Sequence, residues 1–332
     1  MDLTLIWALV IALGVIMYIV LDGFDLGVGI LFPFAPTEDD RDIMMASIAP
    51  VWDGNETWLV LGGAALFGAF PLAYSLLLPA LYVPLTLFLI GLIFRGVAFE
   101  FRAKAQTSKQ AWNLSFAGGS ALATFAQGVV LGSFIQGFPV VDGRPVIEPF
   151  GWLTPFSLAT GAALMAGYAL LGATWLLLKT KGDLQGWCYR AALPLTVAVL
   201  AAIVAVSLWT PFAQPDIAAR WFAMPQFLVL LPIPAVTAGV GLALILAIRY
   251  RREALAFPCA VGLFLLSYAG LAVSLWPYAV PRSITIWQAA APPESQLFLL
   301  VGVLMFLPLV AGYTLYSYYT FRGKVRPEDG YH

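Results

Sequence analysis

Four carboxylates lie within two long apolar stretches of this 332-residue sequence. Asp22 and Asp25 belong to the segment LDGFDLGVG, and Asp53 and Glu56 belong to VWDGNETWL. A charged residue at the centre of a membrane helix costs roughly 2.5–3.5 kcal/mol on insertion scales, so an ionisable residue there indicates a function. Carboxylates, polar groups and water at this depth form proton relays, and a proton pathway is the chemistry that we predict here. The alternative is a self-satisfied polar patch that only locks two helices together.

The spacing of the carboxylates indicates that both pairs face the same region. Within each pair the residues are three apart, so they share one face of a helix. A short connection around residues 36–42 makes the two helices antiparallel neighbours. At about 1.5 Å per residue, Asp25 lies roughly 12 Å from the end of its helix near Pro33, and Asp53 roughly 15 Å from the start of its own near Ile43. Both pairs are therefore expected in the half of the membrane nearer that connection. Small residues that favour close helix packing are Gly23, Gly27 and Gly54.

The nearest fixed cation is in the segment FRGVAFEFR, at the end of a third apolar run. Arg95 lies one to two turns inside that end, and a guanidinium stays charged in proteins. We predict that Arg95 pairs with the buried carboxylates and that Glu100 belongs to the same charged group. The alternative is an arginine side chain that extends to the lipid headgroups. The predicted proton pathway, with Asp53 ranked first, consists of Asp53, Asp25, Asp22, Glu56 and Asn55.

Composition restricts the class of protein. The chain is 61% hydrophobic and 11% charged, whereas soluble domains carry about 25% charged residues. The net charge of −1 gives no basic face for nucleic acid. Cys188 and Cys259 are far apart in apolar runs and are expected to be packing residues. The single histidine is the last residue, His332, which excludes histidine-ligated haem or metal within the membrane. Redox cofactors, if the protein serves redox chemistry, are expected on a partner.

The apolar runs predict an all-α, polytopic membrane protein, with residues 1–332 forming one transmembrane helical domain. Runs of about 20 apolar residues are long enough to span a bilayer. The first is expected to stay attached as a membrane span, because the N-terminus lacks the positively charged region of a cleavable signal peptide. Connections near 137–151, 210–225 and 278–295 are interpreted as ordered interfacial loops. The nine predicted spans are 3–32, 43–70, 77–101, 113–137, 152–179, 187–209, 226–248, 256–277 and 295–321.

The distribution of lysine and arginine predicts the orientation. Nine spans place 14 of the 17 basic residues on one side and only Arg144, Arg220 and Arg282 on the other. Loops rich in lysine and arginine stay in the cytoplasm. The N-terminus is therefore expected outside and the C-terminus inside, with both acidic pairs in the cytoplasmic half of the membrane.

Several segments, in this order, resemble subunit II of the cytochrome bd family of quinol oxidases. The resemblance runs from end to end of the chain, and the first hundred residues carry most of it. The DGFD and WDGN pair in neighbouring helices is its most specific part. Glu56 follows WDGN at a position where some relatives carry an uncharged residue. The matching segments are DGFDLG (22–27), SIAPVWDGN (47–55), GAALF (63–67), FRGVAFEFR (94–102), GATWL (172–176), KTKGDL (179–184), WP (276–277), PRS (281–283) and Trp287.

The resemblance implies an accessory subunit in a bacterial cytoplasmic (inner) membrane complex that oxidises quinol and reduces oxygen to water. It implies a heterodimer with a larger subunit I that holds two b-type haems and one d-type haem and oxidises the quinol. Protons would come from the cytoplasm without pumping. The short chain resembles the compact branch that includes cyanide-insensitive oxidases. No cofactor is expected on this chain directly, while a structural quinone or lipid and a further small single-span subunit remain open.

Two other classes of function stay open on the sequence alone. An independent proton- or cation-coupled transporter would use the acidic residues as its ion site, although such proteins often contain inverted repeats, and no clear repeat is found here. A purely structural partner would use them to hold helices together. Co-purification with a haem-containing chain separates the oxidase subunit from the transporter, and proton-uptake kinetics separate it from the structural partner.

Overall fold

A computed structural model describes residues 2–141 and 144–325. Its elements follow one another as α1 (Leu3–Leu31), η1 (Phe32–Phe34), α2 (Glu38–Ala46), α3 (Trp52–Ala69), α4 (Pro71–Ala80), α5 (Tyr82–Arg102), α6 (Lys109–Gln136), β1 (Val140–Val141), β2 (Arg144–Pro145), α7 (Pro155–Lys179), α8 (Gly182–Ala213), α9 (Pro215–Phe222), α10 (Gln226–Leu230), α11 (Pro232–Arg249), α12 (Glu253–Leu275), β3 (Tyr278–Val280), β4 (Ile284–Thr285), α13 (Ile286–Ala289) and α14 (Pro293–Thr320).

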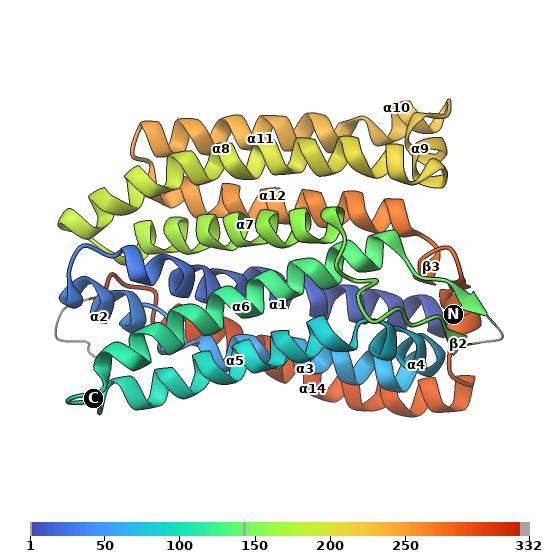
Figure 1. Ribbon diagram of the computed structural model, residues 1–332, viewed down its shortest axis with the longest axis horizontal. Coiled ribbons are helices and arrows are strands. Elements are labelled where there is room, and N and C mark those ends of the chain that lie inside the picture. The colour runs from blue at the N-terminus through green and yellow to red at the C-terminus, as the bar shows by residue number, and fades with distance from the viewer. Residues whose placement is uncertain (1, 142–143, 326–332) are drawn as a thin grey trace.

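The long helices lie side by side in a bundle with α1 at its centre (Figure 1). Helix α1 packs against α3, α6, α7, α12 and α14, while α8 and α11 lie at one edge. Eight of the helices described here are long and apolar enough to cross a membrane, and the bent pair α3–α4 adds a ninth if it is counted as one span. The predicted all-α membrane architecture is therefore confirmed.

The second predicted span, 43–70, is wrong as one continuous helix. Helix α2 ends at Ala46, residues 47–51 form turns, and α3 begins only at Trp52. Pro50 explains the break, because proline lacks a backbone donor and disfavours a helical conformation in the residue before it. After Ala69 the chain bends by 119° into α4, which begins with Pro71. The third span accordingly begins at Tyr82 and not at residue 77.

The connections at the two ends of the bundle differ in character. At the end where α1 begins, they contain the antiparallel hairpins β1–β2 and β3–β4 and the short helices α9 and α10 (Figure 1). Asp2 caps α1 there by accepting from the Leu5 amide at 3.2 Å and also accepts from the Trp287 indole at 2.9 Å. At the opposite end, Lys324 lies against the end of α7, where it donates to the Leu177 carbonyl at 3.0 Å. The described chain thus starts and finishes at opposite ends of the bundle.

Candidate functional site

Two helices bring carboxylates to Arg95, which lies on a third. Arg95 on α5 donates through Nη1 to Asp22 Oδ1 on α1 at 2.7 Å and to Glu56 Oε1 on α3 at 2.8 Å. Its Nη2 lies 3.9 Å from Asp25 Oδ2. The side chains of Arg95, Asp22 and Asp25 are fully buried, whereas Glu56 remains 28% exposed. The ion pair that the sequence predicts is present, and we call these four residues the Arg95 cluster.

The Arg95 cluster is buried because other helices surround α1 at the turn that carries Asp22 and Asp25. Residues 22–29 are all buried. Gly27 crosses Gly172 of α7 so closely that a Cβ on Gly27 would lie 1.8 Å from the Tyr168 carbonyl oxygen. Small residues permit such contacts between membrane helices, so the close packing predicted at Gly27 is confirmed. Gly54 differs, because a Cβ there would meet only the Tyr313 ring at 3.6 Å.

Asn55 connects the Arg95 cluster to the last helix of the chain. Its side-chain amide donates to Asp25 Oδ2 at 2.7 Å and to the Leu21 carbonyl at 3.2 Å. The Tyr318 hydroxyl of α14 donates to Asn55 Oδ1 at 3.0 Å. The ring of Trp52 lies 5.6 Å from the Arg95 guanidinium carbon, in cation–π contact. Sequence spacing gives no signal for Tyr318, which is 263 residues from Asn55.

Several polar atoms of the site have no hydrogen-bond partner among the described residues. They are Asp22 Oδ2, Asp25 Oδ1, Arg95 Nε and Nη2, and the Tyr18 hydroxyl. Buried polar groups are normally satisfied by protein or by ordered water. Three carboxylates also face a single guanidinium, so their full ionisation would leave uncompensated negative charge in a low-dielectric site. The arrangement is therefore suited to hold protons and water.

The remaining predicted site residues lie outside this ion-pair group. Asp53 is exposed in the first turn of α3, about one turn nearer than Glu56 to the start of the helix. Its expected depth of roughly 15 Å inside a helix is wrong, since α3 begins at Trp52. Asp53 and Glu56 still share a face of α3, because they are three residues apart. Glu100 is exposed on α5, the helix that carries Arg95.

A second charged group lies where α2 crosses the end of the bundle, and the sequence analysis missed it. Arg102 is buried and donates to Asp42 at 2.6 Å, to Glu38 at 2.7 Å and to the Asn113 side-chain oxygen at 2.5 Å. Lys109 adds a contact to Asp42 at 3.2 Å. The available signal was Thr37 followed by three acidic residues, which is typical of a helix N-terminus.

The surroundings of Glu38 in this second group keep its carboxyl ionised. Burial by itself raises the pKa of the Glu38 carboxyl, but hydrogen bonds from Arg41 and Asn113 and the charges of Arg102 and Lys109 lower it to about 2. Glu38 is therefore a fixed negative charge at neutral pH, in contrast to a residue that exchanges protons.

The described residues contain no group of three or more His, Cys, Asp or Glu side chains with the arrangement of a metal site. The only histidine, His332, lies outside the described residues. The polar groups of the Arg95 cluster and its neighbours are carboxylates, an amide, a hydroxyl and a guanidinium.

Residues 3–321 match the family model described as cytochrome bd terminal oxidase subunit II. The chain belongs to this family. It is therefore a subunit of a respiratory, oxygen-reducing quinol oxidase, and such a subunit works in a complex with a subunit I.

The chain aligns with similar proteins over nearly its whole length. It is 30% identical to cytochrome bd-I ubiquinol oxidase subunit 2 of Escherichia coli K12, over 98% of this chain and 96% of that one. It is 27% identical to cytochrome bd ubiquinol oxidase subunit 2 of Bacillus subtilis, over 98% and 97%. The bd oxidase structure from Geobacillus thermodenitrificans has the same fold, with a TM-score of 0.79 at 18% identity, over 97% of this chain and 99% of that chain.

Four of the segments that carry the resemblance to subunit II meet in space. DGFD supplies Asp22 and Asp25, FRGVAFEFR supplies Arg95, and WDGN supplies Asn55 and is followed directly by Glu56. GATWL supplies Gly172, which crosses α1 beside them. In this member of the family, these four segments therefore build one buried polar site.

Proposed function

We propose that this subunit supports a larger, haem-bearing subunit I and conducts protons from the cytoplasm toward the oxygen-reducing site of that partner. Two b-type haems and one d-type haem, together with the quinol site, belong to subunit I in this proposal. The observation that carries it is the Arg95 cluster beside Asp53. Exposed Asp53 lies about one turn from partly exposed Glu56, which shares Arg95 with buried Asp22. Oxygen reduction consumes protons, and protons cross apolar packing only along polar groups and water.

The open face of α3 supports contact with the partner. Asp53, Thr57 and Val60 are exposed at helical spacing, and a Cβ on Gly63 would meet no other atom within 4 Å. A carboxylate that faced the hydrocarbon interior of the membrane would be costly. A protein surface that covers the α3 face removes this cost and lies beside Asp53 and Glu56.

The end of the bundle nearest the Arg95 cluster is the proposed cytoplasmic end. The basic residues that precede or follow the long helices gather there, as Lys324 beside the end of α7 and Lys109 beside α2 illustrate. Under the positive-inside rule this end faces the cytoplasm of a bacterial inner membrane. Protons would then cross only the cytoplasmic half of the bundle before they reach the partner.

The test uses the complex purified through a tag on this subunit. The parent complex should show the optical spectrum of b- and d-type haems, and Glu56→Gln should assemble with the same spectrum but take up protons more slowly after oxygen binding. Asp39→Asn, at an exposed position on α2, is the matched control. A haem-free preparation would refute the partner assignment, whereas parent-like proton uptake in Glu56→Gln would refute only the pathway.

A further inference from the structure

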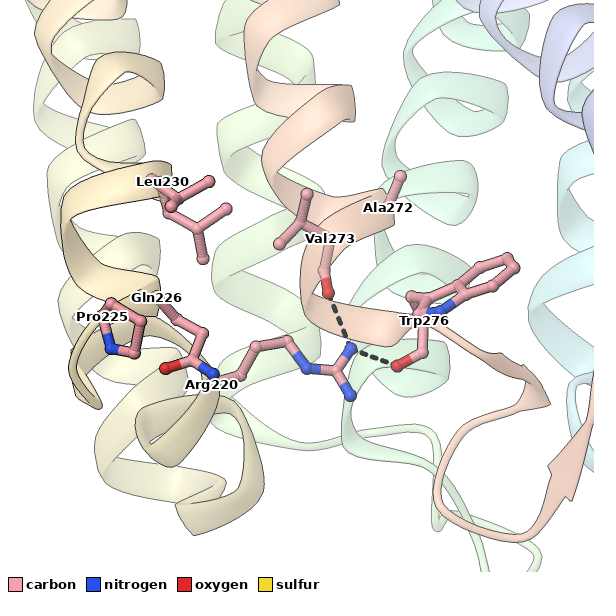
Figure 2. Close-up of a pocket in the computed structure, with 8 residues that line it drawn as sticks. Arg220, Pro225, Gln226, Leu230, Ala272, Val273 and Trp276 are labelled. Carbon is pink, nitrogen blue, oxygen red and sulfur yellow. Dashed lines mark hydrogen bonds between the residues drawn. The ribbon is translucent and has the colours of Figure 1, made fainter.

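A groove lies between α10 and the C-terminal part of α12, at the end of the bundle where α1 begins (Figures 1 and 2). Its volume is about 520 Å³, within the range of about 300–1,000 Å³ that is typical of ligand pockets. Leu230 lies on one wall and Val273 on the facing wall (Figure 2), and Val229 and Ala272 extend these apolar walls. An apolar chain fits such walls because it removes their surface from water.

Arg220 crosses the mouth of this groove. Its side chain extends from α9 to the end of α12, where Nη1 donates to the Val273 carbonyl at 2.8 Å and to the Trp276 carbonyl (Figure 2). The end of a helix carries only about half a negative charge, so it offsets the guanidinium in part. Within the described part of the chain, every hydrogen bond from this guanidinium is made by Nη1, which leaves Nε and Nη2 to bind an acceptor.

Aromatic residues indicate that the mouth lies at the level of the lipid headgroups. Trp276 borders the groove and packs edge-to-face on Trp287, with ring centroids 5.7 Å apart. Both side chains are exposed. Tryptophan concentrates at the boundary between acyl chains and headgroups. The cation therefore lies at headgroup depth, and the apolar walls extend from it toward the membrane interior.

We propose that this groove binds one anionic phospholipid, with an acyl chain between α10 and α12 and its phosphate on Arg220. The groups at the mouth favour an anion, because Arg220 supplies a cation with free donors and the neighbouring Gln226 amide adds further donors. A guanidinium matches a phosphate in geometry as well as charge. A neutral isoprenoid quinone would fill the same walls but would leave the charge of Arg220 only partly offset. The site lies at the opposite end of the bundle from the Arg95 cluster and does not depend on the proton pathway.

The test measures lipid retained by the complex purified from nanodiscs that contain equal amounts of phosphatidylglycerol and phosphatidylcholine. Native mass spectrometry should find phosphatidylglycerol retained by the parent, and about tenfold weaker retention in Arg220→Gln, since hydrogen bonds to charged groups are strong. Arg144→Gln, which removes an exposed arginine at the same end, is the control and should retain lipid as the parent does.

A second variant separates loss of the site from loss of the fold. Ala272→Phe keeps Arg220 and places a ring in the groove from an exposed position, so it should reduce retention while haem content stays unchanged. Equal retention of both lipids by the parent, retained quinone in place of phospholipid, or parent-like retention in both variants would overturn the proposal.

Discussion

Gly27 of α1 and Gly172 of α7 meet backbone to backbone, with no room for a side chain on either. A Cβ on Gly172 would lie 2.4 Å from the Gly27 carbonyl carbon. This crossing is adjacent to the turn that carries Asp22 and Asp25, so the position of the buried carboxylates depends on it.

Gly27→Ala is therefore expected to impair assembly. Overpacking of a close-packed interior typically costs about 1–3 kcal/mol, and here the clash is with backbone, which cannot rotate away. We expect a lower yield of complex and a lower midpoint in a thermal assay that follows haem release. Gly239→Ala on α11 is the matched control, because a Cβ there would meet nothing within 4 Å. Equal stability of both variants would show that the crossing tolerates a methyl group.

Arg95→Leu tests the charge balance of the Arg95 cluster. Removal of one partner from a buried ion pair typically costs about 3–5 kcal/mol because the other charge is left uncompensated. We expect little assembled complex. The double variant Arg95→Leu with Asp22→Asn should recover part of the yield, since it removes one of the orphaned charges. Normal yield and turnover in the single variant would contradict the pairing.

The second charged group, which contains Glu38, Asp42, Arg102 and Lys109, predicts a pH dependence of stability. The pKa of Glu38 is lowered to about 2 from an ordinary 4.5, so its stabilising contribution is complete above about pH 4.5 and is lost as the pH falls toward 2. The side chain is 39% exposed, and solvent screening therefore reduces the effect. Thermal unfolding at pH 7 and pH 3.5 should differ less in Glu38→Gln than in the parent. Asp39→Asn is the control, and an unchanged difference in Glu38→Gln would exclude Glu38 as the cause.

Some features of the candidate site could be predicted from the sequence, and others could not. The pairing of Arg95 with Asp22 and Asp25 was predictable, because an ionisable residue at membrane depth needs a partner and the sequence offers few cations there. The position of Asp53 in the first turn of α3 was not predictable, because it depends on where α3 begins after Pro50. The Tyr318–Asn55 bond and the Arg102–Asp42 pair join segments distant in the chain, and no local spacing encodes them. The proton role assigned to these residues stays a prediction.

Reporter fusions test the orientation. The grouping of basic residues predicts cytoplasmic positions after Lys109 and after Lys181, and an external position after Glu148 in the connection before α7. A reporter active only in the cytoplasm should give signal at the first two sites, and one active only outside should give signal at the third. The reversed pattern would place the Arg95 cluster in the outer half of the membrane and remove the cytoplasmic route for protons.

The proton route itself is tested most directly at Asp53. It is exposed on the open face of α3, on the same side of the helix as Glu56, which in turn shares Arg95 with Asp22. A proton taken up at Asp53 therefore has an acceptor about one turn away. Asp53→Asn keeps the shape of the side chain and its hydrogen-bonding capacity but cannot exchange a proton at working pH. We expect an assembled complex with a parent-like haem spectrum, slower turnover and delayed proton uptake after oxygen binding. Asp53→Glu restores a carboxylate and should recover most of the rate, which a purely structural role would not require. If Asp53→Asn turns over at the parent rate with unchanged proton uptake, the route to the partner bypasses the α3 face.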